Sequence, residues 1–502
     1  MALNSLEFIL FVVLAVAGYY VIPRRFQWIW LLGFSYLYYA SHGPRLLGYL
    51  LFTTATTFLA ARYLERAEEK NKRKFILILT LVLNFGMLGM LKYLNFLIMN
   101  VNRIFDGRWS YLDLALPVGI SFYTFQSMGY LMDVYWKRSE AERNPFRFAL
   151  FVSFFPQILQ GPIGRYSRMA GQLYEEHEWD RRRAEEGLQR ILWGFFKKFV
   201  LADTAAPFVN TLFDKYQAYQ GLAVFAVLAY SIQLYGDFSG GIDVVIGVGK
   251  LFGITMDENF KRPYFARSIT DFWHRWHITL GTWMKDYVFY PVSLSRWMSR
   301  FGKFAKKQFG RSTGRTLPIC LANLIVFFVV GVWHGAAWKF IIYGLYNGAI
   351  IAFSGLMTSQ YRKWKKTLGI REKSGGWQVF QILRTFLLVN ISWFFDRADT
   401  VSQAFSMMKN SVTKWNPAQL LDIPIGAGGT TSFTLFAILI LAAGVCVLFA
   451  VSFLEERGID PFGRLLAAPA VVRMAVYLML LFSFPVFGQI PTSTGGFIYA
   501  QF

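Results

Sequence analysis

Cysteine and charge are both scarce in this chain of 502 residues, and each shortage excludes a class of protein. Cys320 and Cys446 are the two cysteines, so neither a disulfide framework nor a cysteine-rich metal site is available. Charged residues make up 16% of the chain, well below the roughly 25% of an average soluble domain. Hydrophobic residues reach 55%. This composition predicts an integral membrane protein.

Long polar linkers, internal repeats and the alternating pattern of a membrane β-barrel are also missing. About a dozen apolar stretches are instead long enough to cross a bilayer as helices, which predicts roughly 11 to 13 transmembrane or re-entrant helices. Backbone groups cannot stay unpaired in lipid, so these stretches must be helical or buried within the protein. We expect an all-α polytopic protein with one membrane domain over 1–502, its catalytic centre within about 116–348 and C-terminal spans in 377–502. The candidate spans are 8–22, 26–40, 46–61, 75–99, 112–135, 148–160, 195–212, 222–234, 317–332, 340–356, 377–394, 433–453 and 471–487.

Acidic residues are few beside basic ones, 30 against 52, which gives a net charge of +22. The basic residues lie in short loops between spans, as the positive-inside rule describes for a multi-pass protein of the plasma or inner membrane. We therefore expect no nucleic-acid partner and place loops such as 137–143 in the cytoplasm. Segment 296–315 is basic and free of acids, which predicts an interfacial helix, or a docking surface for anionic membrane lipid or an acidic protein.

Histidine is scarce too, and its placement is the strongest sign of chemistry. Three of the five histidines fall in two tryptophan-flanked clusters, D-F-W-H-R-W-H at 271–277 and V-W-H-G at 332–335. An imidazole beside apolar spans is costly without a proton-transfer, ligand or hydrogen-bonding role. His334 follows an apolar run and precedes Gly335, which permits close approach. A desolvated, neutral imidazole there would suit a base that acts on a hydroxyl.

His274 and His277 lie three residues apart, which on a helix puts them on one face near Trp273 and Trp276. A zinc site is one interpretation of this spacing. The sequence has no H-E-x-x-H signature and no third ligand at a familiar spacing, so we expect no metal. For His274, hydrogen-bonded anchoring among the tryptophans is the other interpretation.

Two further motifs place polar side chains beside apolar runs. The first, Y-G-D-F-S-G-G-I-D at 235–243, contributes Asp237 and Ser239 but lacks the G-x-S-x-G elbow of a nucleophilic serine. The second, L-P-V-G-I-S-F-Y-T-F-Q at 116–126, lies in the candidate span 112–135 and ends in Gln126, whose amide must find a partner in the membrane. Segments within 155–340 are short and interrupted by glycine and proline. Such segments are tolerated where they line a protein-buried cavity, so a pocket or channel is expected there.

Six short motifs, taken in order, resemble the membrane-bound O-acyltransferases. The resemblance is to the bacterial branch that includes the alginate O-acetylation membrane protein and the D-alanyl transfer protein of teichoic acid synthesis. Two later segments also resemble that branch. W-F-F-D-R-A-D-T at 393–400 matches it except at Asp396, and G-G-F-I-Y-A-Q-F at 495–502 resembles its aromatic C-terminus except at Ala500. The six motifs are L-P-V-G-I-S-F-Y-T-F-Q at 116–126, F-P-Q-I-L-Q-G-P-I at 155–163, Y-G-D-F-S-G at 235–240, N-F-K-R-P-Y at 259–264, F-W-H-R-W-H-I-T-L at 272–280 and G-V-W-H-G at 331–335.

This resemblance implies a ring of helices around a central tunnel that joins a cytoplasmic donor side to an outer acceptor side. It implies that His334 is the catalytic histidine and His277 the second active-site histidine, with Thr279 where the branch has serine in W-H-x-S-L. The other candidates for tunnel or substrate binding are Gln126, Asp237, Ser239, Trp273, His274, Trp276 and Trp333.

The expected activity is transfer of an acyl group, acetyl in the first instance, from a cytoplasmic thioester for O-acylation of an extracytoplasmic polysaccharide. The donor would be acetyl-CoA or an acylated carrier protein. A thioester is already activated, so no bound cofactor is required. The resemblance also implies an extracytoplasmic partner of the serine-hydrolase-like transferase type. Three alternatives stay open: D-alanyl transfer to teichoic acid from a carrier protein, a transporter or channel, and a scaffold for an extracytoplasmic enzyme.

Overall fold

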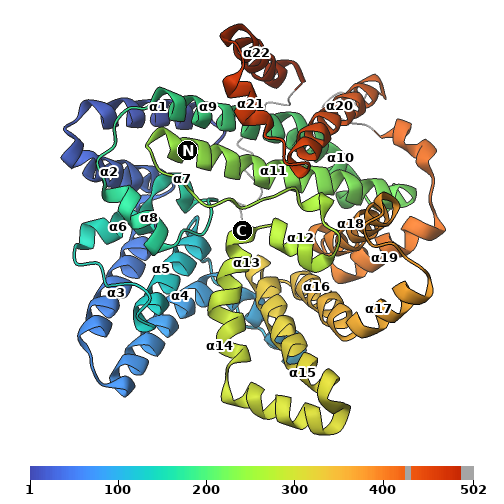
Figure 1. Ribbon diagram of the computed structural model, residues 1–502, viewed down its shortest axis with the longest axis horizontal. Helices are drawn as coiled ribbons and strands as arrows, with labels where there is room; N and C mark the ends of the chain where they lie inside the picture. Colours follow the sequence, from blue (N-terminus) through green and yellow to red (C-terminus); the bar gives the residue numbers. More distant parts are fainter. Residues whose placement is uncertain (424–430, 488–502) are drawn as a thin grey trace. The chain divides into compact units, whose positions relative to one another are not determined.

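Helices make up the fold in the computed structural model, which describes residues 1–423 and 431–487 (Figure 1). The only β pairing in these two ranges is one isolated antiparallel bridge between Phe260 and Trp276. Six helices of the described chain are long and apolar enough to cross a membrane. The prediction of an all-α polytopic membrane protein is confirmed. The expected ending at 495–502 lies outside the described residues, and the count of 11 to 13 spans stays a prediction.

The chain folds as two compact units that alternate along the sequence. Unit 1 comprises Met1–Phe199, Gly236–Glu258 and Phe462–Phe502, and unit 2 comprises Val200–Tyr235 and Asn259–Pro461. Helix α11 (Ala223–Leu251) passes from unit 2 into unit 1 at Gly236. The single membrane domain over 1–502 stays a prediction.

Unit 1 contains the first nine helices and the last one, coloured blue to green and red in Figure 1. The predicted span 148–160 is two short helices instead of one, because Pro156 lacks a backbone N–H and is accommodated in the first turn of a new helix. The helices are α1 (Leu6–Val21), α2 (Gln27–Ala40), α3 (Leu47–Arg66), α4 (Lys70–Phe105), α5 (Ile120–Tyr135), α6 (Pro145–Ser153), α7 (Phe155–Ile158), α8 (Tyr166–Tyr174), α9 (Arg181–Phe195) and α22 (Ala470–Phe487), with α21 (Pro461–Ala467) beginning at the unit boundary.

Within unit 1, α9 and α11 pack with their backbones almost touching. A Cβ atom on Gly194 would lie 2.6 Å from the Gly240 carbonyl oxygen, so neither position has room for a side chain. The chain continues from α9 into a π-helical turn, Phe196–Ala202. This close approach brings the two consecutive lysines of the turn, Lys197 and Lys198, against α11.

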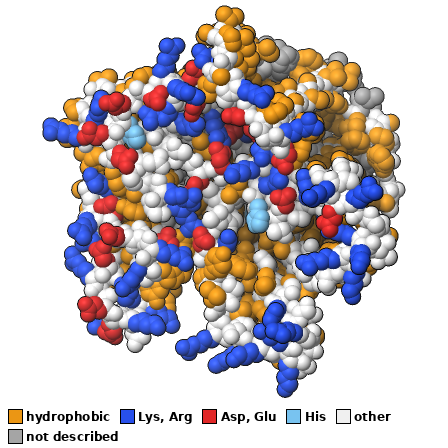
Figure 2. Space-filling model, in the orientation of Figure 1, with side chains coloured by type: hydrophobic (Ala, Val, Ile, Leu, Met, Phe, Trp, Pro, Cys, Tyr) orange, Lys and Arg blue, Asp and Glu red, His pale blue; other side chains and the backbone are white. Residues whose placement is uncertain are grey.

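Unit 2 contains the helices that carry both histidine clusters. Helix α15 is two helices joined at Gly310, which has a left-handed φ of 79°, so the basic segment 296–309 is distinct from the apolar span that follows. Lys and Arg side chains gather at the lower end of Figure 2, over that first part of α15. The helices are α10 (Asp203–Asp214), α12 (Ile269–Arg275), α13 (Ile278–Met284), α14 (Tyr290–Ser293), α15 (Arg296–His334), α16 (Trp338–Leu356), α17 (Thr358–Thr367), α18 (Gly375–Arg397), α19 (Val401–Thr413) and α20 (Thr431–Glu456).

Candidate active site

His277 is held at the junction of α12 and α13 by a short antiparallel pairing of two irregular segments. The Lys261 N–H donates to the Arg275 carbonyl at 2.9 Å, and the Ile278 N–H donates to the Asn259 carbonyl at 3.0 Å. His277 itself has a left-handed φ of 46° and sits at the N-cap of α13. A non-glycine residue with this conformation is uncommon and is worth inspecting for a functional role. The turn breaks the helix that the H-x-x-H spacing predicted, so His274 and His277 do not share one helical face.

Asn259 fixes the tautomer of His277. Its side-chain oxygen Oδ1 accepts from the Thr279 N–H at 3.0 Å and from the Thr279 hydroxyl at 2.9 Å, and it lies 3.2 Å from Nδ1 of His277. Because the backbone N–H of Thr279 requires an acceptor, this atom is the amide oxygen, and the ring nitrogen that faces it must carry the proton. The second nitrogen, Nε2, is then a hydrogen-bond acceptor.

His277 is buried and neutral. Its side chain is 1% exposed, and it lies outside the six candidate spans. Burial lowers the pKa of His277 well below its usual 6.5, and the neighbouring His334 imidazole lowers it further. Burial therefore favours the neutral imidazole, whose Nε2 can accept a hydrogen bond.

His334 ends α15 where that helix meets α16. A Cβ atom on Gly331 would lie 2.5 Å from the Phe340 carbonyl oxygen, so glycine one turn before His334 lets the two helices approach closely. The His334 side chain is buried and packs edge-on against the Tyr343 ring, with centroids 5.0 Å apart. The imidazole is therefore held between two helices of unit 2.

Trp333 connects the two histidines. Its ring centroid is 5.5 Å from that of His277 and 5.1 Å from that of His334, both in edge-on geometry. Trp276 and Trp393 extend the aromatic cluster, with centroids 5.3 Å apart. The structure thus brings His277, His334, Trp276 and Trp333 together, as the sequence motifs predicted only separately.

Two residues that were not predicted as site residues belong to the surroundings of His334: Asp396 lies next to the imidazole, and Tyr230 contacts Asp396. Asp396, near the end of α18, places Oδ1 3.9 Å from His334 Nδ1, and both side chains are at most 4% exposed. The other oxygen of this carboxylate, Oδ2, accepts from the Tyr230 hydroxyl at 2.6 Å. The sequence signal for Asp396 was its departure from the branch's pattern.

A cavity of about 230 Å³ opens beside His277 in unit 2. Trp273 and the exposed His274 line it, together with apolar side chains of α13 and α15 and the cationic Lys285. The indole N–H of Trp273 donates to Asn347 Oδ1 at 3.2 Å, which fixes the orientation of this wall. An apolar pocket with a few polar groups and a neutral imidazole is suited to a small organic substrate.

The remaining predicted candidates lie in unit 1 and have close partners. Gln126 donates to the Phe151 carbonyl at 2.6 Å and accepts from Gln157 at 3.2 Å. Asp237 lies 2.7 Å from the Lys198 ammonium, and Ser239 accepts from Lys197 at 2.9 Å. Their predicted part in a tunnel stays a prediction, because these contacts account for their burial without a substrate.

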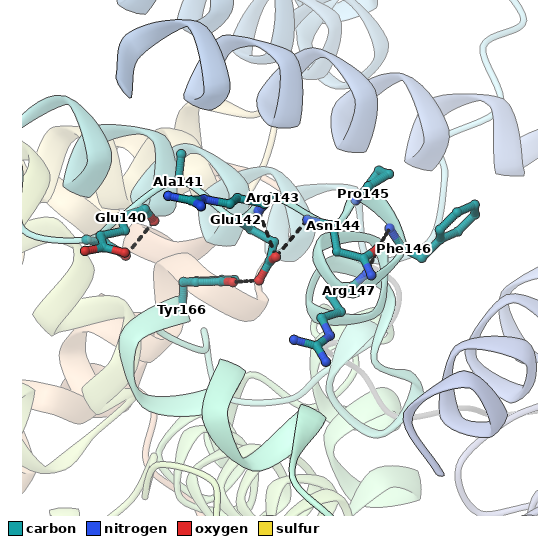
Figure 3. Close-up of a pocket in the computed structure, with 10 residues that line it drawn as sticks. Glu140, Ala141, Glu142, Arg143, Asn144, Pro145, Phe146, Arg147 and Tyr166 are labelled. Atoms are coloured by element: carbon teal, nitrogen blue, oxygen red, sulfur yellow. Dashed lines mark hydrogen bonds between the residues drawn. The ribbon is translucent and has the colours of Figure 1, made fainter. Parts of the chain in front are cut away.

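Unit 1 also contains a wider, open pocket of about 820 Å³ at the loop before α6 (Figure 3). Glu142 organises this loop, since one oxygen accepts from the N–H groups of Arg143 and Asn144 at 2.8 Å and the other from the Tyr166 hydroxyl. Arg147, which also lines the pocket, stacks over the Tyr174 ring at 5.2 Å. Its lining includes residues 139–143 of the loop 137–143, which was expected in the cytoplasm.

Metal ligands do not gather in the described chain. Across residues 1–423 and 431–487, no three His, Cys, Asp or Glu side chains are close enough to hold an ion. The expectation that no metal takes part stays a prediction.

Comparison with known proteins identifies the family. The model of the membrane-bound O-acyltransferase family matches residues 142–306 and 307–395, a range that includes both histidines. The chain belongs to this family, and it is an acyltransferase and a multi-pass membrane protein. The resemblance stated from the six motifs is thereby confirmed.

Several bacterial relatives match over most of the chain. A peptidoglycan O-acetyltransferase of Helicobacter pylori is 31% identical over 427 residues, 79% of this chain and 76% of the relative. A protein of Azotobacter vinelandii named probable alginate O-acetylase AlgI is 33% identical over 431 residues, 83% of this chain and 80% of the relative. A teichoic acid D-alanyltransferase of Bacillus subtilis is 30% identical over 264 residues, 51% of this chain and 62% of the relative.

Proposed function

We propose that this protein transfers an acetyl group from a cytoplasmic thioester across the plasma or inner membrane, for O-acetylation of an extracytoplasmic polysaccharide. The observation that carries the proposal is the pair of buried histidines around Trp333, of which His277 lines a small apolar cavity. The first two relatives are named as an O-acetyltransferase and a probable O-acetylase, which supports an acetyl group over a D-alanyl group as the group transferred. The donor is acetyl-CoA or an acetylated carrier protein, and no bound cofactor takes part.

In this proposal His334 is the general base. The acceptor hydroxyl gives its proton to the imidazole as its oxygen attacks the thioester carbonyl carbon. The carbon–sulfur bond then breaks, and the leaving thiolate takes up the proton. General-base assistance of this kind contributes about 10²- to 10⁴-fold to a rate.

His277 orients the acceptor. Its Nδ1 faces the Asn259 oxygen, so Nε2 is the nitrogen that can accept a hydrogen bond from a substrate hydroxyl. Its neutral state supports this role, because an imidazolium has no lone pair for the acceptor.

The route of the acetyl group also belongs to the proposal. The cavity beside His277 admits the acyl end of the thioester, with Lys285 and the exposed His274 at its edge. On the outer side, a partner of the serine-hydrolase-like transferase type receives the acetyl group and delivers it to the polymer. Trp276 and Trp333 hold the walls of the reaction chamber.

The first test is the acetyl-ester content of cell-surface polysaccharide in a deletion strain that carries wild type or His334→Gln. We expect wild type to restore acetyl ester and His334→Gln to leave it at least about 100-fold lower, because the base is lost. Membrane levels are compared by immunoblot. His42→Gln serves as the matched control, since His42 lies in unit 1, where its ring contacts the carbonyl and the ring of Tyr38.

Chemical identification of the ester separates the proposal from its alternatives. Mild base releases acetate if acetyl is transferred and D-alanine if the chain acts in teichoic acid synthesis. Full activity of a stably inserted His334→Gln protein would contradict the proposed role of this histidine and would favour a scaffold.

A further inference from the structure

Asp396 presents a half-satisfied carboxylate to His334 inside unit 2. Oδ2 accepts the Tyr230 hydroxyl at 2.6 Å, but Oδ1 is buried without a hydrogen-bond donor among the described residues. The nearest ring nitrogen is Nδ1 of His334, 3.9 Å away. The oxygen of Asp396 that lacks a donor is therefore the one closer to the imidazole.

A positive charge lies beside the same carboxylate. The Lys339 ammonium donates to the backbone carbonyls of Asp396 at 3.2 Å and Ala398 at 2.7 Å, at the end of α18. A buried carboxylate is tolerated when cations and hydrogen bonds compensate it. Lys339 provides the cation and Tyr230 provides a hydrogen bond to Oδ2, while Oδ1 still lacks a donor.

The imidazole can supply that donor only in one tautomer. A neutral histidine carries a single ring N–H, so a proton on Nδ1 directed to Asp396 leaves Nε2 as the basic lone pair. At 3.9 Å the two atoms are beyond hydrogen-bond distance. Catalytic hydrogen bonds are often long without substrate and shorten in the complex.

We propose that Asp396 is a positioning residue that holds His334 with Nδ1–H toward the carboxylate and Nε2 toward the acceptor hydroxyl. When Nε2 takes the hydroxyl proton, the carboxylate stabilises the imidazolium until the thiolate removes that proton. Tyr230 fixes the orientation of the carboxylate. This inference rests on the proposed role of His334 as the base.

A structural role alone does not account for the arrangement. A carboxylate that only joined α18 to its neighbours would be expected to have hydrogen bonds at both oxygens, as buried polar groups usually do. Asp396 uses one oxygen for Tyr230 and leaves the other facing the imidazole. The two roles differ in what they predict for kcat.

The test uses the full-length protein in lipid nanodiscs, with a radiolabelled acetyl thioester as donor. Asp396→Asn keeps the size of the side chain and can present an amide N–H to Nδ1, which favours the wrong tautomer. We expect kcat to fall by about 10²- to 10⁴-fold, by analogy with the aspartate of serine-protease triads, while KM for the donor changes less than about twofold. Asp396→Glu, which retains a carboxylate, is expected to recover part of kcat.

Asp399→Asn is the matched control, because Asp399 is exposed, three residues further along, and the change is chemically identical. Asp396→Asn with wild-type kcat, alongside an inactive His334→Gln, would overturn this inference and leave the proposed function intact. Activity in His334→Gln itself would overturn both.

Tyr230→Phe keeps the inference testable if Asp396→Asn does not accumulate. This change removes only the hydroxyl that donates to Oδ2 and keeps the ring between its neighbours. We expect a smaller fall in kcat, about 3- to 10-fold, at unchanged donor KM, as for removal of one hydrogen bond of about 1 kcal/mol. An unchanged kcat in Tyr230→Phe together with an inactive Asp396→Glu would contradict a positioning role.

Discussion

Single residues decide the protonation of the site. His277 and His334 are chemically identical, yet one faces an amide oxygen and the other a carboxylate. A neutral acceptor fixes the tautomer of His277 without favouring its imidazolium. In the proposed arrangement the Asp396 carboxylate holds the tautomer of His334 and stabilises the imidazolium that forms when the hydroxyl proton is taken up. The two environments therefore suit one histidine to orient a hydroxyl and the other to take its proton.

The buried, neutral state of His277 makes folding stability depend on pH. Because burial lowers its pKa in the folded protein, the unfolded chain binds a proton near pH 6.5 that the folded chain does not. The stability associated with the neutral imidazole is complete well above pH 6.5 and is lost as pH falls below 6.5. We expect His277→Gln to lose less thermal stability than wild type between pH 7.5 and 5.5, measured by differential scanning fluorimetry in detergent.

His274→Gln is the comparison for that measurement, since His274 is exposed and only three residues away. It should keep the wild-type dependence on pH. Equal slopes for wild type and His277→Gln would show that His277 titrates normally in the folded protein.

At the scale of elements, the junction of α9 and α11 carries a buried charge network in unit 1. Lys197 lies 2.5 Å from Asp243 and Lys198 lies 2.7 Å from Asp237, with both lysines 3% exposed. Arg190 adds hydrogen bonds to Asp243 at 2.8 and 3.0 Å. Two consecutive lysines of the π-helical turn thus pair with acidic residues of one helix, α11.

Breaking one of these pairs should destabilise the fold more than it affects chemistry. Removal of one partner of a buried ion pair typically costs about 3 to 5 kcal/mol, because the other charge is left uncompensated. We expect Asp237→Asn to lower the thermal unfolding midpoint and the amount of protein in the membrane. The specific activity of the folded fraction should change little. Both are measured on protein purified by size-exclusion chromatography.

Glu69→Gln is the control, since the Glu69–Lys72 pair on the surface is more than half exposed on both sides and should contribute almost nothing. A variant Asp237→Asn that is stable but inactive would instead support the predicted place of Asp237 in a substrate tunnel.

Sequence patterns predicted the helices and the two histidine clusters better than the contacts between them. Apolar stretches and short motifs are local, so the all-α class and the two clusters could be predicted from neighbouring residues. Asn259 and His277 meet through pairing of two irregular segments, which has no hydrophobic period. Asp396 lies on another helix than His334. The sequence marked Asp396 only as a departure from a motif, which does not predict its distance from His334.

At the scale of the whole molecule, the membrane protein is built from two units whose segments alternate in the sequence. Helix α22 belongs to the same unit as α9, more than 250 residues earlier, and packs on it through two kinds of contact. Arg473 lies 3.2 Å from Glu185, and the Phe484 ring lies 6.3 Å from that of Phe195. The segments between them include those that carry His274, His277 and His334.

This order has a consequence for biosynthesis. A ribosome completes the histidine-bearing segments before it makes α22, so α9 enters the membrane without its last partner and waits through the synthesis of unit 2. The contacts of Glu185 and Phe195 with α22 can therefore form only after the described segments of unit 2 have been synthesised.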